Sequence, residues 1–411
     1  MSKTIPAHNF CNSVFDGTHD TPKPCENGHP LILSKNIQRN SINLQDTYNI
    51  SEEDYNAINA RSKVSQWDIL FSMIGTVGSV YLEKSKDIPY AIKNMGVFST
   101  KDELKAKWLY YYLQTNEAKS IISNYLNGAV QKFLPLGFLR EFPVREMPRN
   151  AKEIISVLEN IDSKIDNNNA IAAELEGMAK DLYDYWFVQF DFPDENGKPY
   201  KSSGGKMVWN EELKREIPEG WEVDRLGKAC DTLLGGTPDT ENALYWNGDI
   251  PWLNSGEVAT SPVLNAEKTI TKEGLKNSAT SFASAGAVVM SITRYIRPSI
   301  LGIDACFNQS VIAVIPNEQI HSTYLYMFML SQVERYMRLR TGAQQPHINK
   351  ETVDSTLITL PVDSVLNQFY DRVEPLFERQ MIAMKEAKEL ESLRDFLLPI
   401  LMNGQVKVKG A

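Results

Sequence analysis

The feature that most constrains this 411-residue chain is an internal repeat. The stretch Gly17–Thr21, with the sequence GTHDT, returns 219 positions later as Gly236–Thr240, with the sequence GTPDT. Two further pairs extend the match: Pro30–Ser34 with Pro251–Ser255, and Gly128–Gln131 with Gly342–Gln345. A duplicated monomer of this kind is predicted to contain an internal pseudo-twofold axis and to present two similar but non-identical surfaces. Such a chain suits a target that has two unlike halves.

A long charged stretch with helical periodicity follows each copy, at residues 150–187 and 365–402. Core positions recur at alternating spacings of four and three residues, which predicts a coiled-coil seam about four heptads long. The seam positions are Ile154, Leu158, Ile161, Ile165, Asn168, Ala172, Leu175, Ala179 and Leu182 in the first stretch, and Phe369, Val373, Leu376, Gln380, Ala383, Ala387, Leu390, Arg394 and Leu397 in the second. We expect the two helices to pair antiparallel, with Asn168 as a polar position that fixes the register. The resulting rod, on the order of 50 Å long, would hold the two copies at opposite ends.

The length and composition fit two globules of about 150 residues each, joined by connectors. A hydrophobic content of 42% and a charged content of 23% are typical of a globular protein. Apolar runs at Trp67–Ile74 and Ala287–Ile292 predict buried strands, and Glu103–Leu113 and Tyr324–Leu339 predict helices, so each copy is expected to be a mixed α/β globule. The expected segments are residues 1–149 for the first globule, 150–190 for the first helical spacer, 191–215 for a turn-rich linker, 216–362 for the second globule, 363–404 for the second spacer and 405–411 for a tail.

Two features indicate a cytoplasmic protein. No apolar run reaches the roughly 18 residues needed to span a bilayer, and the N-terminal residues lack a signal-peptide core. The four cysteines, Cys11, Cys25, Cys230 and Cys306, form no CxxC pair and do not indicate a disulfide framework. We therefore expect neither a membrane partner nor an extracellular location.

A cluster of possible zinc ligands occupies the first 29 residues: His8, Cys11, His19, Cys25 and His29. Four such side chains could bind zinc. The second copy keeps a cysteine, Cys230, opposite Cys11, but has Gly227 and Pro238 opposite the first two histidines. A small buried thiol in each copy explains this pattern better, so we expect no metal in the chain.

The net charge of −9 argues against a stand-alone, high-affinity DNA-binding protein, which usually carries a basic surface. Residues 1–149 hold 17 Lys and Arg against 15 Asp and Glu, whereas residues 150–190 hold 3 against 8. The first helix is therefore better suited to a protein partner than to phosphate. The second globule, residues 216–364, is also acidic, with 11 against 17, so its DNA binding would depend on local groups such as Arg294, Arg297, Arg335, Arg338 and Arg340. These counts favour DNA binding as part of a complex.

Most sequence signatures of catalysis are absent. The chain contains neither GxGxxG nor GxxxxGK[ST], and it lacks the Pro-Pro-aromatic signature with which amino-methyltransferases hold a flipped base. A Mg²⁺-dependent nuclease site could be assembled from Asp194, Glu212 and Lys214. These residues lie in a polar linker, and one such coincidence is expected among 52 acidic residues. We therefore predict no catalytic residues.

The polar loops of both copies carry side chains suited to reading DNA. Arg and Lys can pair with guanine edges, Asn and Gln with adenine, and Ser or Thr with phosphate or with either base. The candidates in the first copy are Thr18, His19, Thr21, Lys23, Lys35, Asn36, Arg39, Ser72, Thr76, Gln131 and Lys132. Those in the second copy are Thr237, Thr240, Asn254, Ser255, Arg294, Tyr295, Arg297, Gln344, Gln345, His347 and Lys350. Turn formation alone would explain any single one of them, but the repeat retains the polar loops while changing their details, as two readers of different half-sites would.

At these residues the chain resembles the specificity subunits of type I restriction-modification enzymes, over nearly its whole length. The segments that carry the resemblance are Gly236–Gly256, Thr341–Ile348, Leu393–Leu401, Asp184–Phe187 and Ile217–Trp221. One departure is visible, because Met1 aligns with Gly220 and the first copy has no counterpart of Ile217–Trp221. Either the start is naturally short, or the C-terminal tail completes the edge of the first globule.

The resemblance implies a non-catalytic subunit with two target-recognition domains, which are the two globules, and two helical spacers. Each domain would read one half of a bipartite, asymmetric site in double-stranded DNA, and the spacers would set the gap. The subunit would join two methylation subunits and, for restriction, motor-nuclease subunits, directing adenine methylation or cleavage. The chain itself would hold no cofactor, since S-adenosylmethionine, ATP and Mg²⁺ would bind the partner subunits. The alternative is a protein-interaction scaffold without base readout of its own.

Overall fold

The computed structural model describes residues 3–38, 41–127, 133–293, 296–342 and 346–406. The chain divides into two compact units. The first unit comprises Met1–Lys164 and Glu389–Ala411, and the second comprises Ile165–Lys388. Each unit therefore contains one copy of the repeat together with a part of each long helix. The functional assignment of the individual segments stays a prediction.

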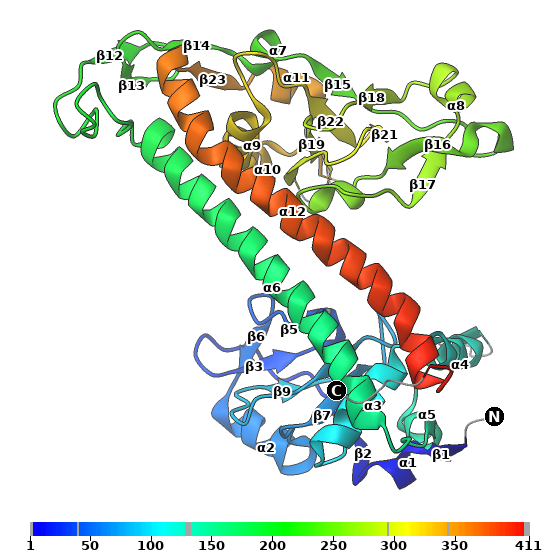
Figure 1. The fold of residues 1–411 in the computed structure, drawn as a ribbon. Helices are drawn as coiled ribbons and strands as arrows, with labels where there is room; N and C mark the ends of the chain where they lie inside the picture. The colour runs from blue at the N-terminus through cyan, green and yellow to red at the C-terminus, as the bar shows by residue number, and fades with distance from the viewer. Residues whose placement is uncertain (1–2, 39–40, 128–132, 294–295, 343–345, 407–411) are drawn as a thin grey trace. The chain divides into compact units, whose positions relative to one another are not determined.

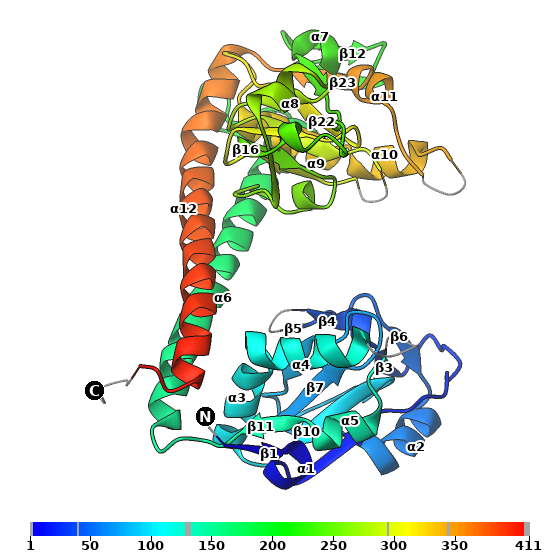
Figure 2. The same cartoon turned by 90° about the vertical axis from the view of Figure 1, so that its right-hand side faces the viewer.

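The first unit is built on an antiparallel four-stranded sheet. Its strands follow the order β2 (Ser13–Asp16), β10 (Met95–Ser99), β7 (Asp68–Ser72) and β8 (Val80–Leu82). Every residue of the two central strands, β7 and β10, is buried, as the apolar runs predict, and the strands lie side by side in Figure 2. A second sheet has the order β6 (Tyr48–Ile50), β3 (His29–Ile32) and β9 (Ala91–Ile92), in which β3 pairs parallel with β9.

Shorter elements complete the first unit. The strand β1 (Thr4–Pro6) pairs with β11 (Pro143–Arg145), and β4 (Ile37–Gln38) pairs with β5 (Ser41–Ile42). The helices are α1 (Ala7–Phe10), the 3-10 turn η1 (Ser34–Asn36), α2 (Glu52–Ser62), α3 (Glu103–Leu113), α4 (Asn116–Asn127) and α5 (Leu136–Glu141). The helix α3 begins where Asp102 accepts a hydrogen bond from the backbone N–H of Lys105 at 2.8 Å, and its bounds are those the sequence predicts.

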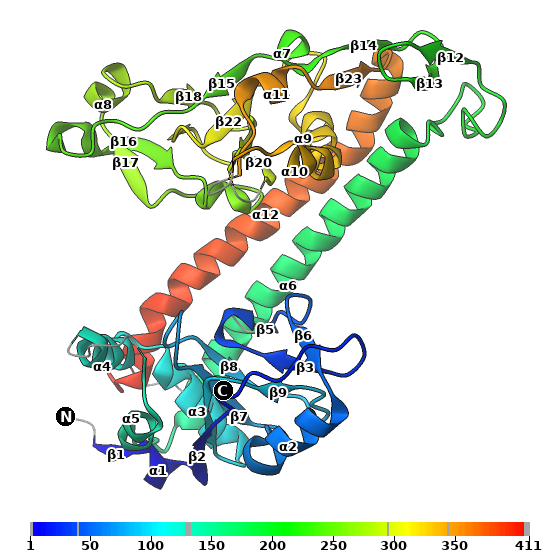
Figure 3. The ribbon, with the colours of Figure 1, turned by 180° about the vertical axis from the view of Figure 1, so that it is seen from behind.

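The second unit repeats the four-stranded antiparallel sheet and has a second sheet with one strand more. Its four-stranded antiparallel sheet has the order β15 (Thr232–Leu234), β22 (Val311–Val314), β19 (Val288–Ser291) and β20 (Pro298–Ile300). Its second sheet has the order β17 (Lys268–Ile270), β16 (Trp246–Leu253), β21 (Ala305–Phe307) and β18 (Ser281–Ala283), and here β16 pairs parallel with β21, as β3 does with β9. Figure 3 shows β16 and β17 side by side. The predicted internal repeat is confirmed.

The other elements of the second unit include two strand pairs and several short helices. The strand β12 (Met207–Asn210) pairs with β13 (Arg215–Pro218), and β14 (Glu222–Arg225) pairs with β23 (Leu357–Leu360). The helices are α7 (Leu226–Ala229), η3 (Ala243–Tyr245), η4 (Glu257–Ala259), α8 (Lys272–Lys276), α9 (Ser322–Ser331), α10 (Val333–Leu339) and α11 (Lys350–Asp354).

The single helix predicted for Tyr324–Leu339 is in fact two helices, α9 and α10. The backbone N–H of Gln332 bonds to the carbonyl of Met329 at 3.2 Å, three residues back rather than four. The Ser331 hydroxyl also donates to the carbonyl of Phe328 at 2.6 Å. These local bonds end α9 at Ser331. The apolar periodicity of the sequence does not reveal the break between the helices, because both helices contain buried residues.

The repeated Gly-Thr motif owes its glycine to close backbone packing in both copies. A Cβ atom at Gly17 would lie 2.5 Å from the carbonyl oxygen of Ile92. A Cβ atom at Gly236 would lie 2.5 Å from the carbonyl carbon of Ala279. Because neither contact leaves room for a side chain, the glycine is a packing requirement of the fold, and the side chains available for recognition lie beyond it.

The two long helices, α6 (Ala151–Tyr183) and α12 (Asp363–Met402), pair antiparallel within each unit (Figure 1), as the heptad pattern predicts. In the first unit, Arg394 donates to Asp162 at 3.0 Å. In the second unit, Asn168 donates to Glu386 at 2.9 Å, and the rings of Tyr183 and Phe369 lie 6.4 Å apart. Along α6 the residue numbers of the contacting residues rise, while those of their partners on α12 fall, as expected for antiparallel helices. All the seam positions named from the sequence are buried or half-buried.

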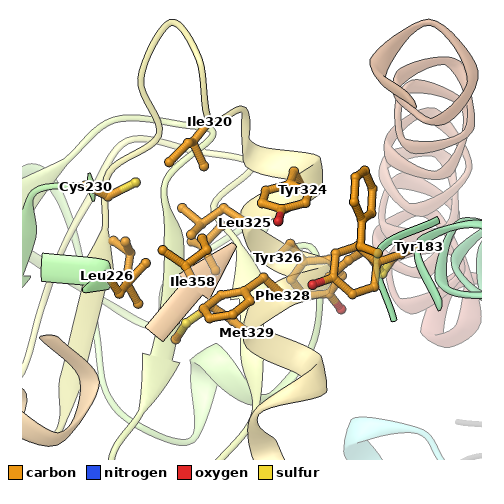
Figure 4. Close-up of a cluster of buried hydrophobic side chains, with 14 of the residues drawn as sticks. Tyr183, Leu226, Cys230, Ile320, Tyr324, Leu325, Tyr326, Phe328, Met329 and Ile358 are labelled. Atoms are coloured by element: carbon orange, nitrogen blue, oxygen red, sulfur yellow. The ribbon is translucent and has the colours of Figure 1, made fainter. Parts of the chain in front are cut away.

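Parts of both long helices belong to the hydrophobic core of each unit. The first core includes Ile154 and Leu158 of α6 with Leu398 and Leu401 of α12. In the second unit, Tyr183 of α6 lies beside the tyrosines of α9 (Figure 4), and a π-helical turn, Asp184–Val188, continues the helix. The ring of Phe187 in this turn lies 4.8 Å from those of both Tyr324 and Phe369. The helices are therefore structural members of the units that they connect.

We expect only one of the four cysteines to react rapidly with an aromatic disulfide reagent in the folded protein. Burial raises the pKa of Cys11 to about 12 and the pKa of both Cys230 and Cys306 to about 11, so these thiols stay protonated and covered at about pH 8. Cys25 is partly exposed. Titration should give one fast equivalent before denaturation and four after it, and the fast equivalent should vanish in Cys25→Ser. Fast labelling that persists in this variant would show that a buried thiol is accessible.

Candidate nucleic-acid interface

Three loops converge in the first unit, and the described residues of two of them include predicted DNA-reading side chains. The first loop follows β2 and contains the Gly17–Thr21 motif, the second connects β7 to β8, and the third precedes α5. Ile74 and Phe133 form an isolated antiparallel bridge between the second and third loops, and the N–H of Leu134 donates to the carbonyl of Met73 at 3.0 Å. A pocket of about 180 Å³ is lined by residues from all three loops. The structure thus gathers loops that are more than 50 residues apart in the sequence.

The Gly-Thr loop is held to the strand connection that follows β9. His19 is exposed, and its Nε2 donates to the carboxylate of Asp16 at 3.0 Å, since an ionised carboxylate can only accept. Its Nδ1 lies 2.9 Å from the amide oxygen of Asn94. Thr18 is buried, and its hydroxyl accepts from the N–H of Asp20 at 3.1 Å. Polar groups of this loop are therefore fixed in place before any ligand arrives.

The other candidates of the first unit differ in exposure. Lys35 forms an exposed ion pair with Asp46 at 3.1 Å. Asn36 is fully buried, and its amide group accepts from the N–H of Leu33 and donates to the carbonyls of Asn43 and Asp46. Ser72 is also fully buried. These two side chains support loops rather than reach solvent. Thr21, which accepts from Lys93, and Lys23 and Thr76 are exposed.

The second unit reproduces the loop arrangement at the level of single hydrogen bonds. The Ser72 hydroxyl donates to the carbonyl of Ile74 at 3.1 Å, and the Ser291 hydroxyl, 219 positions later, donates to that of Thr293 at 2.9 Å. The bridge between Ile74 and Phe133 has its counterpart in one between Thr293 and His347. His347 also exchanges two backbone hydrogen bonds with Thr341, each of 2.9 Å. The same scaffold therefore presents apolar side chains in one unit and polar ones in the other.

The remaining candidates of the second unit have different roles. Thr240 and Arg297 are exposed, and the Thr237 hydroxyl donates to Gln309 at 2.6 Å. Asn254 accepts from the N–H groups of Gly256 and Glu257, at 2.8 and 3.3 Å, and shapes the turn that includes the half-buried Ser255. Lys350 donates to Asp354 at 2.6 Å and to Thr232 at 2.5 Å, inside a local network. The candidates that lie outside the described residues are Arg39, Gln131, Lys132, Arg294, Tyr295, Gln344 and Gln345.

The structure adds a pair of residues that the sequence analysis did not select, Asn94 and Gln309. They occupy equivalent positions in the two units. Each residue of β10 corresponds in the strand pairing to the residue of β22 that lies 215 positions later, and Asn94 and Gln309 are separated by the same number. Each amide contacts the Gly-Thr loop of its own unit, through His19 in the first unit and Thr237 in the second. The only indication of this pair in the sequence is that both copies have an amide side chain at this offset. The residues around it differ too much between the copies to reveal the correspondence.

The described part of the chain contains no group of three or more His, Cys, Asp or Glu side chains placed to hold a metal ion. His8, His19 and His29 instead contact Arg140, Asp16 and Glu52, respectively. Among the same residues, no helix combines the length and apolar character that crossing a membrane requires.

Comparison with known proteins agrees with this organisation. A family model described as "Type I restriction modification DNA specificity domain" matches residues 20–177 and 218–392. The chain is 24% identical over 315 residues to the MjaIX type I restriction enzyme specificity subunit of Methanocaldococcus jannaschii, covering 75% of this chain and 71% of that protein. It is 20% identical over 409 residues to the HindI specificity subunit of Haemophilus influenzae, covering 84% and 88%. A crystal structure of the S subunit of a type I restriction-modification system from M. genitalium shares the fold, with a TM-score of 0.52 at 15% identity over 98% of this chain and 96% of that one.

Proposed function

This chain belongs to the type I restriction-modification DNA specificity family, and we propose on that premise that its two units read the two halves of a bipartite, asymmetric DNA site. The observation that carries the proposal is the duplicated loop platform. Both units hold a Gly-Thr loop, a strand-end serine and a bridging residue in the same arrangement, while the exposed side chains differ. Two platforms of one geometry with different side chains suit two different half-sites.

We further propose that the chain acts as a non-catalytic subunit. It would direct adenine methylation by two methylation subunits and, with motor-nuclease subunits, restriction of unmodified DNA. S-adenosylmethionine, ATP and Mg²⁺ would bind those partners, since this chain carries none of the phosphate-binding motifs sought in the sequence. The exposed candidates His19, Thr240 and Arg297 would contact DNA directly, whereas the buried Asn36 and Ser72 would hold the loops that carry such contacts.

We expect the purified chain to bind DNA weakly and to gain affinity and sequence preference when it joins its methylation subunits. A net charge of −9 gives the isolated chain little attraction for phosphate. Binding titrations at several salt concentrations should give a steeper dependence of log K on log salt for the complex, because each neutralised phosphate adds about one unit to the slope. Footprinting should then show the complex protecting two separated half-sites.

The alternative role as a protein-interaction scaffold makes a different prediction for the same measurements. A scaffold would leave the sequence preference of the complex unchanged when one unit is replaced by that of a relative. In the proposed role, that exchange should change one half-site and leave the other intact. Tight, sequence-specific binding by the chain alone would contradict the expected dependence on partners.

A further inference from the structure

The pocket between the three loops of the first unit has an apolar wall. Its apolar lining consists of Met73, Ile74, Phe133, Pro135 and Leu136. Met73 is buried, but 43% of Ile74 and 38% of Phe133 is exposed to solvent. The two side chains are neighbours and form a small apolar surface beside polar groups, which a ligand can cover. A volume of about 180 Å³ is several times the roughly 30 Å³ that a water molecule occupies in the liquid, so the pocket has room for more than a single small group.

The opposite side of the pocket is polar. Asp16, His19 and Asn94 line it, and the hydrogen bonds between them hold His19 at its edge. The carboxylate of Asp16 is a hydrogen-bond acceptor, and the side-chain amide of Asn94 can both donate and accept. The pocket therefore offers an apolar surface, a donor and an acceptor within one small space.

The fold does not require the apolar wall, as the second unit demonstrates. Thr293 and His347 occupy the positions of Ile74 and Phe133 and form the same backbone bridge. The serine that supports this loop also makes the same hydrogen bond in both units. Polar residues therefore satisfy the same backbone geometry, and the apolar pair occurs in the first unit alone. Its apolar character is better explained by a ligand of the first unit than by the fold.

We infer that this pocket receives the major-groove edge of a T·A base pair, with the 5-methyl group of thymine against Ile74 and Phe133. In the major groove, thymine presents a methyl group and the acceptor O4, and its paired adenine presents the donor N6 amino group. The apolar wall matches the methyl group, the amide of Asn94 can donate to O4, and the carboxylate of Asp16 can accept from N6. Cytosine and guanine present no methyl group there, so the wall discriminates against a G·C pair.

This inference rests on the proposed function and specifies one base pair in the half-site read by the first unit. The test uses the complete complex of this chain with its methylation subunits and a duplex that carries its bipartite site, identified beforehand by mapping modified adenines in the genome. Each thymine of both half-sites is replaced in turn by deoxyuridine, which lacks only the 5-methyl group. At one position of one half-site, the substitution is expected to weaken binding about four-fold, the factor equivalent to one buried methyl or methylene group.

A variant tests whether this pocket is the source of the effect. Ile74→Thr combined with Phe133→His copies the residues of the second unit onto the first, and in this variant the sensitive thymine and deoxyuridine should bind equally well. The matched control is Thr293→Ile combined with His347→Phe, which changes the second unit and should leave the deoxyuridine effect at the sensitive thymine of the first unit's half-site unchanged. Because the substitution scan on the unaltered complex needs no variant, the absence of any deoxyuridine effect would overturn the assignment even if the exchanged residues impair folding.

The outcomes separate the two proposals. Specific binding to a bipartite site without any deoxyuridine effect would overturn the pocket assignment and leave the proposed function intact. A deoxyuridine effect that persists in the Ile74→Thr, Phe133→His variant would place the methyl contact elsewhere and overturn the assignment as well. If the complex shows no preference for any sequence, the proposed function itself is wrong and the inference fails with it.

Discussion

Replacing Asp162 by alanine is expected to lower the free energy of unfolding by about 3 kcal/mol, because it leaves the guanidinium group of Arg394 buried without its buried carboxylate partner. Only 8% of Asp162 and 6% of Arg394 is exposed, and their charged groups meet at 3.0 Å. Asp162 also accepts from the hydroxyl of Tyr111 at 2.7 Å, so the substitution removes two bonds at once. Arg394 keeps the exposed Asp395, which places the expected loss at the lower end of the range of about 3–5 kcal/mol for broken buried pairs.

Urea unfolding followed by circular dichroism would measure this loss. The matched control is Glu146→Gln, which breaks an exposed pair with Lys3 in the same unit and should cost less than about 1 kcal/mol. A second variant, Asp162→Leu with Arg394→Met, replaces both charges by apolar groups and should recover most of the stability. Equal, small losses for Asp162→Ala and Glu146→Gln would mean that the pair is not buried in solution.

Adding one heptad to each long helix is expected to lengthen the gap between the two half-sites by about three base pairs. Seven residues at a rise of about 1.5 Å each add roughly 10 Å to a helix, and base pairs are spaced at about 3.4 Å. A whole heptad keeps the seam in phase, so the helices can still pair. The half-sites themselves should not change, because the loops that we propose to read DNA lie outside the helices.

Methylation activity of this lengthened variant is expected to fall. Three base pairs rotate one half-site by roughly 100° about the DNA axis, given about 10.5 base pairs per turn, and the complex must twist to follow. Genome-wide mapping of modified adenines measures both the gap and the extent of modification. Altered half-sites at the original gap would show that the helices are not the ruler and would overturn the proposed division of labour.

The long helices and the duplication were predictable because their signals are periodic. The heptads identify a seam whose positions are buried or half-buried, and the polar Asn168 pairs across it with Glu386. The buried partnership of Asp162 with Arg394 was not predictable, since Asp162 lies off the nine seam positions and meets its partner 232 residues away. The end of α9 at Ser331 was missed for a related reason: one hydroxyl and one backbone bond decide it, and neither alters the apolar pattern.

For the candidate interface, the sequence does not show which polar side chains face outward. The sequence does not predict that the loops around His19 and Thr76 border one pocket, because folding creates this pocket when it brings Ile74 to Phe133. Polarity alone cannot distinguish an exposed group from one that bonds its own loop, so the buried Asn36 and Ser72 were selected together with exposed residues. The apolar Ile74 and Phe133 were not predicted, because hydrogen bonding to phosphates and base edges points only to polar side chains.

The sharing of both long helices between the cores has a consequence for how the protein is made. The first core needs Ile154 and Leu158 from α6 and also Leu398 and Leu401 from the end of α12. About 240 residues separate these groups, and ribosomes add about 5–20 residues per second, so the first unit waits on the order of 10–50 s for its last core residues. All residues of the second unit, Ile165–Lys388, are synthesised before the last core residues of the first unit. The second unit is one continuous stretch of chain, and its core includes α9. During synthesis, the N-terminal half therefore carries an unfinished apolar surface, and the unit that begins first is the one that folds to completion last.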